Sequence, residues 1–304
     1  MTVVAAIPET SAPAARETRP APPIRQILFP SDLSDESHRA FHHARLLAEA
    51  FGARVTLYHV VTPPWHEEPK DPSDPQRVAL QRAEDMARDH LEGQLAGSKL
   101  AGEVVVEHRP SAYRALVARI AATTPDLTVM ATHGREGIAH LFLGGVTEMV
   151  VQYGRCPVLT VREPDHGIAL PYRRVLVPTD LSLASRRAFP MAALLARTFG
   201  AEVVAVHVAP EPRRSLLAGV SDAVAAVPTE TDLSSFLGKD FDGVRVIPQV
   251  FLGKAWDRIV FTARVEKADV IVMSTHGHDS LTDRVIGSHT ERVVRHAPCP
   301  VLIV

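Results

Sequence analysis

Two short segments carry carboxylates that could bind a ligand. Asp32 follows Pro30-Ser31, and Asp180 follows Pro178-Thr179, each directly after a short apolar run. A carboxylate in such a loop can accept hydrogen bonds from ribose hydroxyls or from the amine of a base. Taken alone this signal is weak, because an aspartate after proline is more often a turn residue that caps a helix.

Two glycine-bracketed segments follow a later apolar run in each half of the chain. Residues 277–287 begin and end with glycine and are followed by Ser288, and residues 134–144 repeat the spacing with Gly145 in the following position. Glycines between a strand and a helix let main-chain N–H groups approach phosphate oxygens. Isolated glycines more often mark turns, so the argument depends on finding both kinds of loop in both halves.

The two halves are an internal duplication. Residues 27–60 align without a gap to residues 175–208, and 19 of the 34 aligned pairs are identical. Chance would give roughly two identical pairs, and a period of this size indicates tandem domains and not a solenoid of short repeats.

Each half predicts strands that alternate with helices, which is typical of a parallel sheet covered on both faces. We therefore expect an α/β protein with two tandem, doubly wound, five-stranded parallel-sheet domains. After the second strand, Asp74-Pro75 predicts the start of a long charged helix to about Leu95, whereas the second half predicts a shorter or broken helix. Further strands are expected at 55–61, 104–107, 127–131, 244–250 and 270–274.

The predicted domains cover residues 25–163 and 164–304, with a polar, proline-bearing linker at about 162–171. Residues 1–24 are rich in proline and alanine, and we expect a disordered tail there. In an open parallel sheet, ligands bind beyond the carboxyl ends of the strands, where the strand order reverses. Both the aspartate loops and the glycine segments are expected at that place.

Composition excludes several classes of protein. The net charge of −2 gives no electrostatic case for nucleic acid, and no apolar run approaches the length of about 18 residues that a membrane span needs. The N-terminus lacks the pattern of a signal peptide, and two cysteines are too few for a disulfide scaffold. We expect a cytoplasmic protein with Cys156 and Cys299 as small buried thiols.

The motifs taken together resemble the universal stress protein family over residues 25–304. They are the Pro-Ser/Thr-Asp turns, the His-Val pairs at 59–60 and 207–208, the Thr-His-Gly segments, the spacing Gly-x9-Gly and the closing Cys-Pro-Val-Leu runs. The resemblance implies a Rossmann-like fold of the adenine-nucleotide alpha-hydrolase type and a part in stress response.

The nucleotide-binding branch of that family carries G-x2-G-x9-G-[S/T] together with the aspartate after the first strand. The resemblance therefore implies bound ATP, with Mg²⁺ alongside it, adenosine near the aspartate and the end of the second strand, and phosphates on the glycine segment. The matching residues of the second half are Asp180, Val208, Ser274, Gly277, Gly287 and Ser288, with Ser274 in place of the first glycine. Those of the first half are Asp32, Val60, Ala131, Gly134, Gly144 and Gly145, with Ala131 in place of the first glycine and Gly145 in place of the hydroxyl residue.

We expect the second half to bind ATP more tightly than the first. The hydroxyl that Gly145 lacks is worth about 0.5–1.5 kcal/mol to a neutral partner, and about 1.5–3 kcal/mol to a charged phosphate. Thr147 and Thr290 could supply a further hydroxyl to phosphate in each half.

Other chemistries find little support in the sequence. It contains neither a Walker A segment nor a G-x-G-x-x-G fingerprint, and no general base is placed to activate water, so no catalytic residue is assigned. Ser182 is expected to cap a helix, and His42-His43 to lie at the surface. His276, His278 and His289 lack a cysteine or carboxylate at zinc-site spacing, so no metal site is assigned.

Two alternatives to an ATP-binding regulatory module stay open. One is an interaction protein of the same fold that binds no nucleotide, and the other is a slow ATPase. The resemblance also implies that the two halves pair through their last strands, residues 158–161 against 301–304. Association of two chains into a homodimer is left open.

Overall fold

The structure is a computed structural model that describes residues 23–63, 71, 73–132, 145–162, 170–211, 227–275 and 287–304. The predicted tail lies outside these residues except for its last two positions, and of these Ile24 is buried. Most of the predicted linker also lies outside them.

The first half alternates strands and helices throughout. Its elements are β1 (Gln26–Pro30), α1 (Asp35–Phe51), β2 (Arg54–Val61), α2 (Pro75–Ser98), β3 (Gly102–His108), α3 (Ala112–Thr123), β4 (Leu127–Ala131), α4 (Gly145–Tyr153) and β5 (Val158–Val161).

The second half repeats this succession with one interruption. Its elements are β6 (Arg174–Thr179), the 3₁₀ helix η1 (Ser185–Ala188), α5 (Phe189–Phe199), β7 (Glu202–Ala209), α6 (Glu230–Leu237), β8 (Val246–Leu252), α7 (Ala255–Val265), β9 (Val270–Met273), α8 (Ser288–His296) and β10 (Val301–Ile303).

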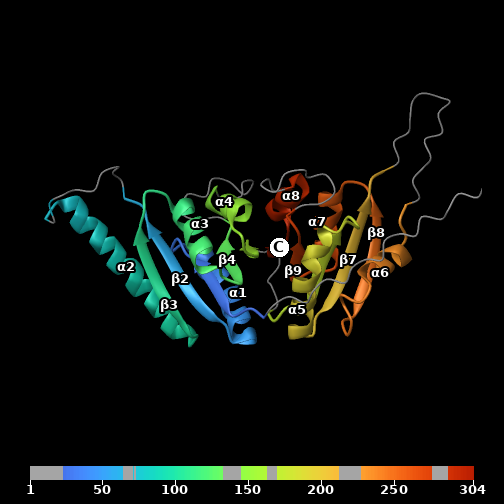
Figure 1. Ribbon diagram of the computed structural model, residues 1–304, viewed down its shortest axis with the longest axis horizontal. Coiled ribbons are helices and arrows are strands. Elements are labelled where there is room, and N and C mark those ends of the chain that lie inside the picture. The colour runs from blue at the N-terminus through green and yellow to red at the C-terminus, as the bar shows by residue number, and fades with distance from the viewer. Residues whose placement is uncertain are drawn as a thin grey trace, which may run out of the picture.

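The ten strands of the described residues form one sheet in the order β3-β2-β1-β4-β5-β10-β9-β6-β7-β8 (Figure 1). Pairing is parallel within each half, and the strand order reverses between β1 and β4 and again between β6 and β9. The halves join where β10 runs antiparallel to β5, with Leu302 opposite Leu159. The predicted class, two tandem doubly wound α/β domains, is confirmed.

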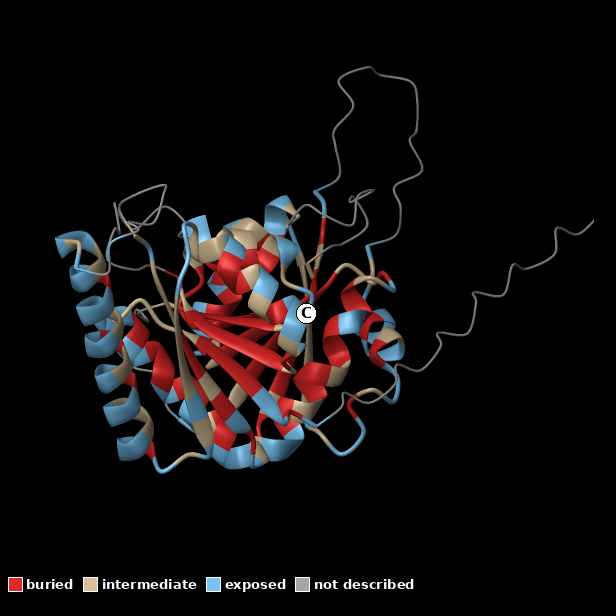
Figure 2. Cartoon of the chain, turned by 60° about the vertical axis from the view of Figure 1, so that its left-hand side comes forward, coloured by how far each residue is buried: buried red, intermediate tan, exposed pale blue. Residues whose placement is uncertain are grey.

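Two apolar layers hold helices against the two faces of this sheet, and each layer runs through both halves. One contains residues of α1, α2, α5 and α6 together with alternate residues of the strands. The other contains residues of α3, α4, α7 and α8 with the intervening strand residues. Figure 2 shows the buried strands enclosed between helices whose outer sides are exposed. Burial on both faces explains why the strands are apolar runs and not alternating ones.

The helix after the first strand differs between the halves, although the sequence predicts the same helix in both. In the first half Ser34 caps α1 by accepting the Ser37 N–H at 3.2 Å. In the second half a 3₁₀ helix precedes α5, which begins with Phe189 and Pro190. Proline lacks an N–H and clashes with the carbonyl four residues earlier, so an α-helix cannot run through this position. The predicted difference in the next helix is confirmed, since α6 has 8 residues and α2 has 24.

One histidine predicted at the surface is instead buried between the halves. His42 is exposed, but the side chain of His43 lies against Tyr172, with His43 Nδ1 2.9 Å from the tyrosine hydroxyl. The two rings are stacked with centroids 5.9 Å apart, and Tyr172 also packs edge-on against Phe199 of α5. His43 follows Ala40 by three residues and precedes Leu47 by four, so the helical period places it on the buried face of α1.

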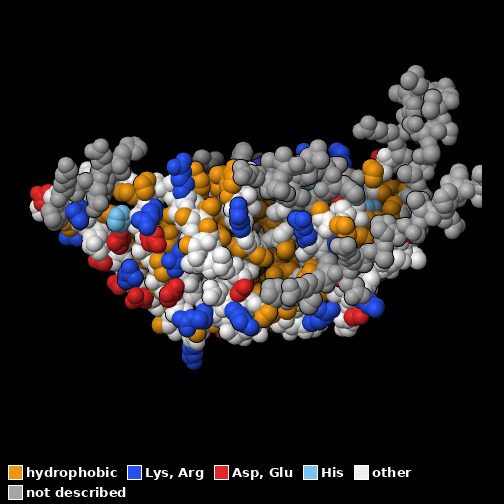
Figure 3. Space-filling model, in the orientation of Figure 1, with side chains coloured by type: hydrophobic (Ala, Val, Ile, Leu, Met, Phe, Trp, Pro, Cys, Tyr) orange, Lys and Arg blue, Asp and Glu red, His pale blue; other side chains and the backbone are white. Residues whose placement is uncertain are grey.

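The surface carries charges of both signs. On the face in Figure 3, Lys and Arg side chains are interspersed with Asp and Glu. Among the described helices none combines the length and the hydropathy that crossing a bilayer would require.

Candidate functional site

The two aspartate loops lie at the carboxyl edge of the sheet, beside the strand ends that lead to the glycine segments. Asp32 is two residues beyond β1, which pairs with β4, and Asp180 directly follows β6, which pairs with β9. Each loop therefore lies where the strand order reverses, the usual position of ligands in open α/β sheets.

Each aspartate loop contains a non-glycine residue in the left-handed region. Leu33 has φ of 64° and Leu181 has φ of 62°. Such a conformation costs of order 1 kcal/mol or more for a residue with a Cβ atom, and it persists only when the surroundings impose it. In both halves the N–H of this leucine donates to the hydroxyl two residues earlier, Ser31 Oγ at 3.1 Å or Thr179 Oγ1 at 3.0 Å.

The two carboxylates have different surroundings. Asp32 Oδ1 accepts from the Ser34 hydroxyl and the Ser37 hydroxyl, both at 2.6 Å, and from the Ser34 N–H at 3.1 Å. Asp180 Oδ1 accepts from the N–H of Ser182 at 3.0 Å.

The repeat equivalent of Ser37 is Ser185, and its hydroxyl has different hydrogen-bond partners. It lies 2.8 Å from Thr179 Oγ1 and donates to the carbonyl of Ser182 at 2.9 Å. The two equivalent serines therefore bond differently. Ser37 donates to the Asp32 carboxylate, whereas the Ser185 hydroxyl lies beside that of Thr179.

A histidine from the second strand of each half contacts the residue before the aspartate. His59 Nδ1 lies 2.7 Å from the carbonyl oxygen of Ser31, and His207 Nδ1 lies 2.9 Å from that of Thr179. A carbonyl oxygen only accepts, so Nδ1 carries the proton in both rings. The sequence contained a signal for these residues, since the histidine is identical in both copies, but it did not predict this contact.

The glycine segments lie largely outside the described residues. This applies to Gly134, Gly144 and Gly277, and to His276 and His278. Their far ends are described, because Gly145 begins α4, and Gly287 caps α8, which begins at Ser288.

A side chain at position 287 would make a tight contact with the backbone. A Cβ atom there would come within 3.2 Å of the carbonyl oxygen of Thr275, whereas a Cβ atom at Gly145 would meet nothing within 4 Å. The N–H of Gly287 donates to that same carbonyl at 3.1 Å. The first N–H groups of α8 lack intrahelical acceptors and are available to an anion at the helix start.

The two predicted threonines are buried and tie the last helix of each half to the preceding strand. Thr147 Oγ1 donates to the carbonyl of Ala131 at 2.9 Å, and Thr290 Oγ1 donates to that of Ser274 at 3.2 Å. Their hydroxyl protons are thus directed at backbone oxygens. The predicted residues Val60 and Val208 are half-buried at the ends of β2 and β7.

The remaining titratable groups do not form a reactive cluster in the described part of the chain. Burial raises the pKa of the Cys299 thiol, and it also raises that of Cys156, whose sulfur lies 3.2 Å from Thr128 Oγ1. Neither cysteine is in a disulfide, and the described residues contain no group of three or more His, Cys, Asp or Glu that could hold a metal ion.

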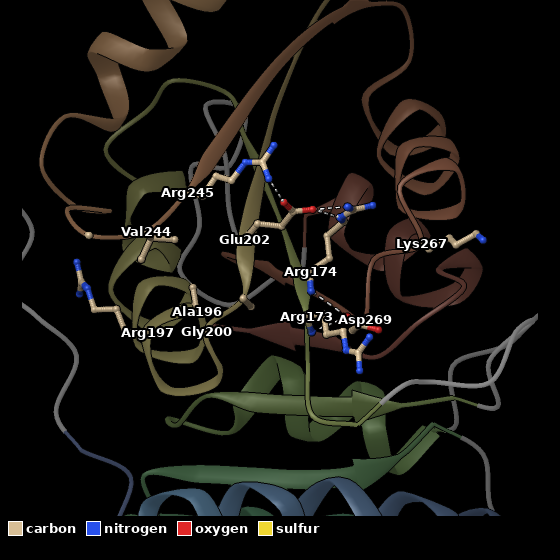
Figure 4. A pocket seen from close by; sticks show the side chains of 12 residues that line it. Arg173, Arg174, Ala196, Arg197, Gly200, Glu202, Val244, Arg245, Lys267 and Asp269 are labelled. Atoms are coloured by element: carbon tan, nitrogen blue, oxygen red, sulfur yellow. Dashed lines mark hydrogen bonds and ion pairs between the residues drawn. The ribbon is translucent and has the colours of Figure 1, made fainter.

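A basic cavity of about 720 Å³ lies at the opposite edge of the second half, where its strands begin. Its central cation, Arg174, is paired with Glu202 and with Glu266, and Arg245 lies 3.4 Å from Glu202. Figure 4 shows Glu202 between Arg245 and Arg174, with Arg197 and Lys267 extending away from one another on opposite sides. Because Arg174 and Arg245 pair locally and Arg197 and Lys267 do not converge, the carboxyl edge is the stronger candidate site.

Comparisons with known proteins agree with this geometry. The family model described as "Universal stress protein family" matches residues 23–162 and again 171–304. A universal stress protein of Mycolicibacterium smegmatis is 26% identical over 299 residues, which covers 91% of this chain and 96% of that protein. One from Methanocaldococcus jannaschii is 34% identical over 139 residues, covering 44% of this chain and 82% of its own length.

A solved structure of a universal stress protein from Archaeoglobus fulgidus has the same fold. Its TM-score is 0.69 at 19% identity, covering 91% of this chain and 97% of that structure. With the family model matching both halves, the chain belongs to the universal stress protein family.

Proposed function

We propose that this chain binds ATP, more tightly in its second half, and acts in stress response as a nucleotide-linked regulatory module of the cytoplasm. The single observation that carries the proposal is Gly287 at the start of α8, where an added Cβ atom would come within 3.2 Å of the Thr275 carbonyl oxygen. Together with Asp180 on the adjacent loop, this supplies a carboxylate for the ribose and a glycine-lined helix start for the phosphates.

The residue types in the second half support ATP as the ligand. Asp180 and Val208 would hold the adenosine, and the second glycine segment with Ser288 would hold the phosphates. Mg²⁺ bound with the nucleotide would be held mainly by phosphate oxygens, since Mg²⁺ keeps several waters and takes few protein ligands. The residues of this chain bind and orient; none is assigned to activating water.

The antiparallel contact between β5 and β10 supports the idea that one chain contains the pairing that two single-domain proteins would make. Thr160 adds a hydrogen bond across it, donating to the carbonyl of Val301 at 3.0 Å. The contact also covers two strand edges that would otherwise be open to association. The unpaired cysteines fit a reducing cytoplasm.

The test begins with nucleotide released by heat from the purified full chain and identified by mass, followed by calorimetric titration with ATP and Mg²⁺. We expect an adenine nucleotide or a measurable heat of ATP binding. A nucleotide-free protein that gives no heat with millimolar ATP would refute the proposal. Phosphate release above the buffer rate would add hydrolysis to the function.

A further inference from the structure

We infer that His207, and His59 in the first half, are positioning residues that aim the aspartate loop at the nucleotide. This rests on the proposed ATP binding. Each histidine bonds through Nδ1 to the carbonyl of the residue immediately before the aspartate, at 2.9 Å in the second half and 2.7 Å in the first.

The bond acts on the peptide plane that sets the direction of the aspartate side chain. Thr179 contributes that carbonyl, and its peptide group joins it to Asp180. Fixing the carbonyl direction limits rotation about the bonds on either side of this peptide, and so limits where the Asp180 carboxylate can point.

The loop needs such a restraint because it holds a strained residue. Leu181 and Leu33 both lie in the left-handed region directly after the aspartate. A turn of this kind persists only when surrounding contacts impose it, and such turns gather at ligand sites. His207 is buried, so its bond to the carbonyl is shielded from competing water.

Both copies of the duplicated domain contain this arrangement. The middles of strands β2 and β7 share few residue types. In the alignment of the two halves, Thr56-Leu57-Tyr58 corresponds to Val204-Ala205-Val206. The histidine and the following valine are nevertheless the same in both, and so is the hydrogen bond.

The experiment compares two replacements of nearly equal shape. In His207→Asn the amide nitrogen takes the place of Nδ1, two bonds from Cβ, and can still donate to the carbonyl; His207→Leu cannot donate. We expect His207→Leu to weaken ATP binding roughly three- to tenfold, as for loss of one hydrogen bond, and His207→Asn to stay within about twofold of the parent.

A double-mutant cycle with Asp180→Ala separates positioning from general stability. If His207 acts through Asp180, the effect of His207→Leu on ATP affinity falls below about twofold in the Asp180→Ala background. An undiminished effect in that background, or equal weakening by Asn and Leu, would overturn the inference. All titrations are done in an Asp32→Ala background, so that the second half is measured alone.

A spectroscopic measurement decides the matter should His207→Leu fail to fold. In the ¹⁵N-labelled parent chain, long-range proton–nitrogen correlation should report a proton on His207 Nδ1, and His207→Asn assigns the signal. A proton on Nε2 alone would contradict the inference. If the parent binds no ATP at all, the proposed function fails, and this tautomer still tests the hydrogen bond independently.

Discussion

The turn after the first strand has a similar backbone conformation in both halves, but the side-chain hydrogen bonds around it differ. Both turns place a leucine in the left-handed region, and both receive a histidine bond from the neighbouring strand. Ser37 donates to Asp32, whereas Ser185 bonds to Thr179, and the helix that follows is continuous in one half and interrupted in the other. The two halves therefore share the turn that carries the aspartate and differ in the hydrogen bonds and the helix behind it.

The largest effect on stability is expected from a buried ion pair in the second half. Arg186 and Asp240 form an ion pair with Nε and Oδ2 2.7 Å apart, and both side chains are only 3% exposed. Asp240→Ala leaves a buried guanidinium uncompensated, so we expect a loss of about 3–5 kcal/mol in unfolding free energy by urea denaturation. The double variant Arg186→Met, Asp240→Leu should recover most of it.

The first half supplies the matched control for this prediction. His38 is the repeat equivalent of Arg186 and is exposed, so His38→Ala should change the unfolding free energy by less than about 0.5 kcal/mol. If Asp240→Ala were as harmless as His38→Ala, the ion pair would not support the second half.

The second prediction concerns the loss of stability in acid that protonation of His43, at the contact between the halves, should cause. Burial, with a smaller contribution from the charge of His42, lowers the pKa of His43 from 6.5 to about 4. The unfolded chain binds a proton near pH 6.5 and the folded chain only near pH 4, so stability is full above about pH 6.5 and falls as the pH drops toward 4. The shift corresponds to about 3 kcal/mol of unfolding free energy.

Replacing His43 with methionine, the residue at its repeat equivalent Met191, should remove this part of the pH dependence. Tyr172 faces the ring from the segment before β6, and its burial keeps the hydroxyl protonated. His42→Met, on the exposed side of α1, is the control and should leave the slope between pH 6.5 and 4 nearly unchanged. An unaltered slope in His43→Met would show that other groups cause the acid sensitivity.

The third prediction compares the glycines at the starts of α8 and α4. Gly287→Ala brings a Cβ atom to 3.2 Å from the Thr275 carbonyl, so we expect a loss of about 1–3 kcal/mol in stability and weaker ATP binding. Gly145→Ala meets no atom within 4 Å and should be neutral or slightly stabilising. Thermal melts with and without ATP measure both, and equal effects would contradict the distinction.

The smallest expected effect comes from exchanging the residues that begin these helices. Ser288→Gly should weaken ATP binding in the second half, and Gly145→Ser should strengthen it in the first, each by roughly three- to tenfold. Both positions are exposed, so the fold should tolerate either change. Affinities that stay within twofold would mean that the hydroxyl does not contact the nucleotide.

The fold was predictable from sequence because apolar runs and helical periodicity recur in both halves. The interruption at Pro190 was readable in principle, since proline cannot continue a helix from η1. The inward position of His43 was also readable from its spacing on α1. The partners Asp240 and Tyr172 were not, because each lies far along the chain from the residue it contacts and only the tertiary fold brings them together.

The candidate site was predictable in its outline and not in its internal bonds. Asp32 and Asp180 lie on loops whose place follows from strand order alone. The direction of each hydroxyl proton does not follow from a motif, because Thr147 and Thr290 donate to backbone oxygens that the fold presents. The same limit applies to Ser37 and Ser185, which the alignment makes equivalent and the structure makes different.

Calorimetric titration of two single variants with ATP and Mg²⁺ tests the central claim, that the second half binds more tightly, most directly. Asp180→Ala should weaken the tighter site severalfold, whereas Asp32→Ala should retain an affinity close to that of the parent chain. The reverse order, or equal losses in the two variants, would contradict the account.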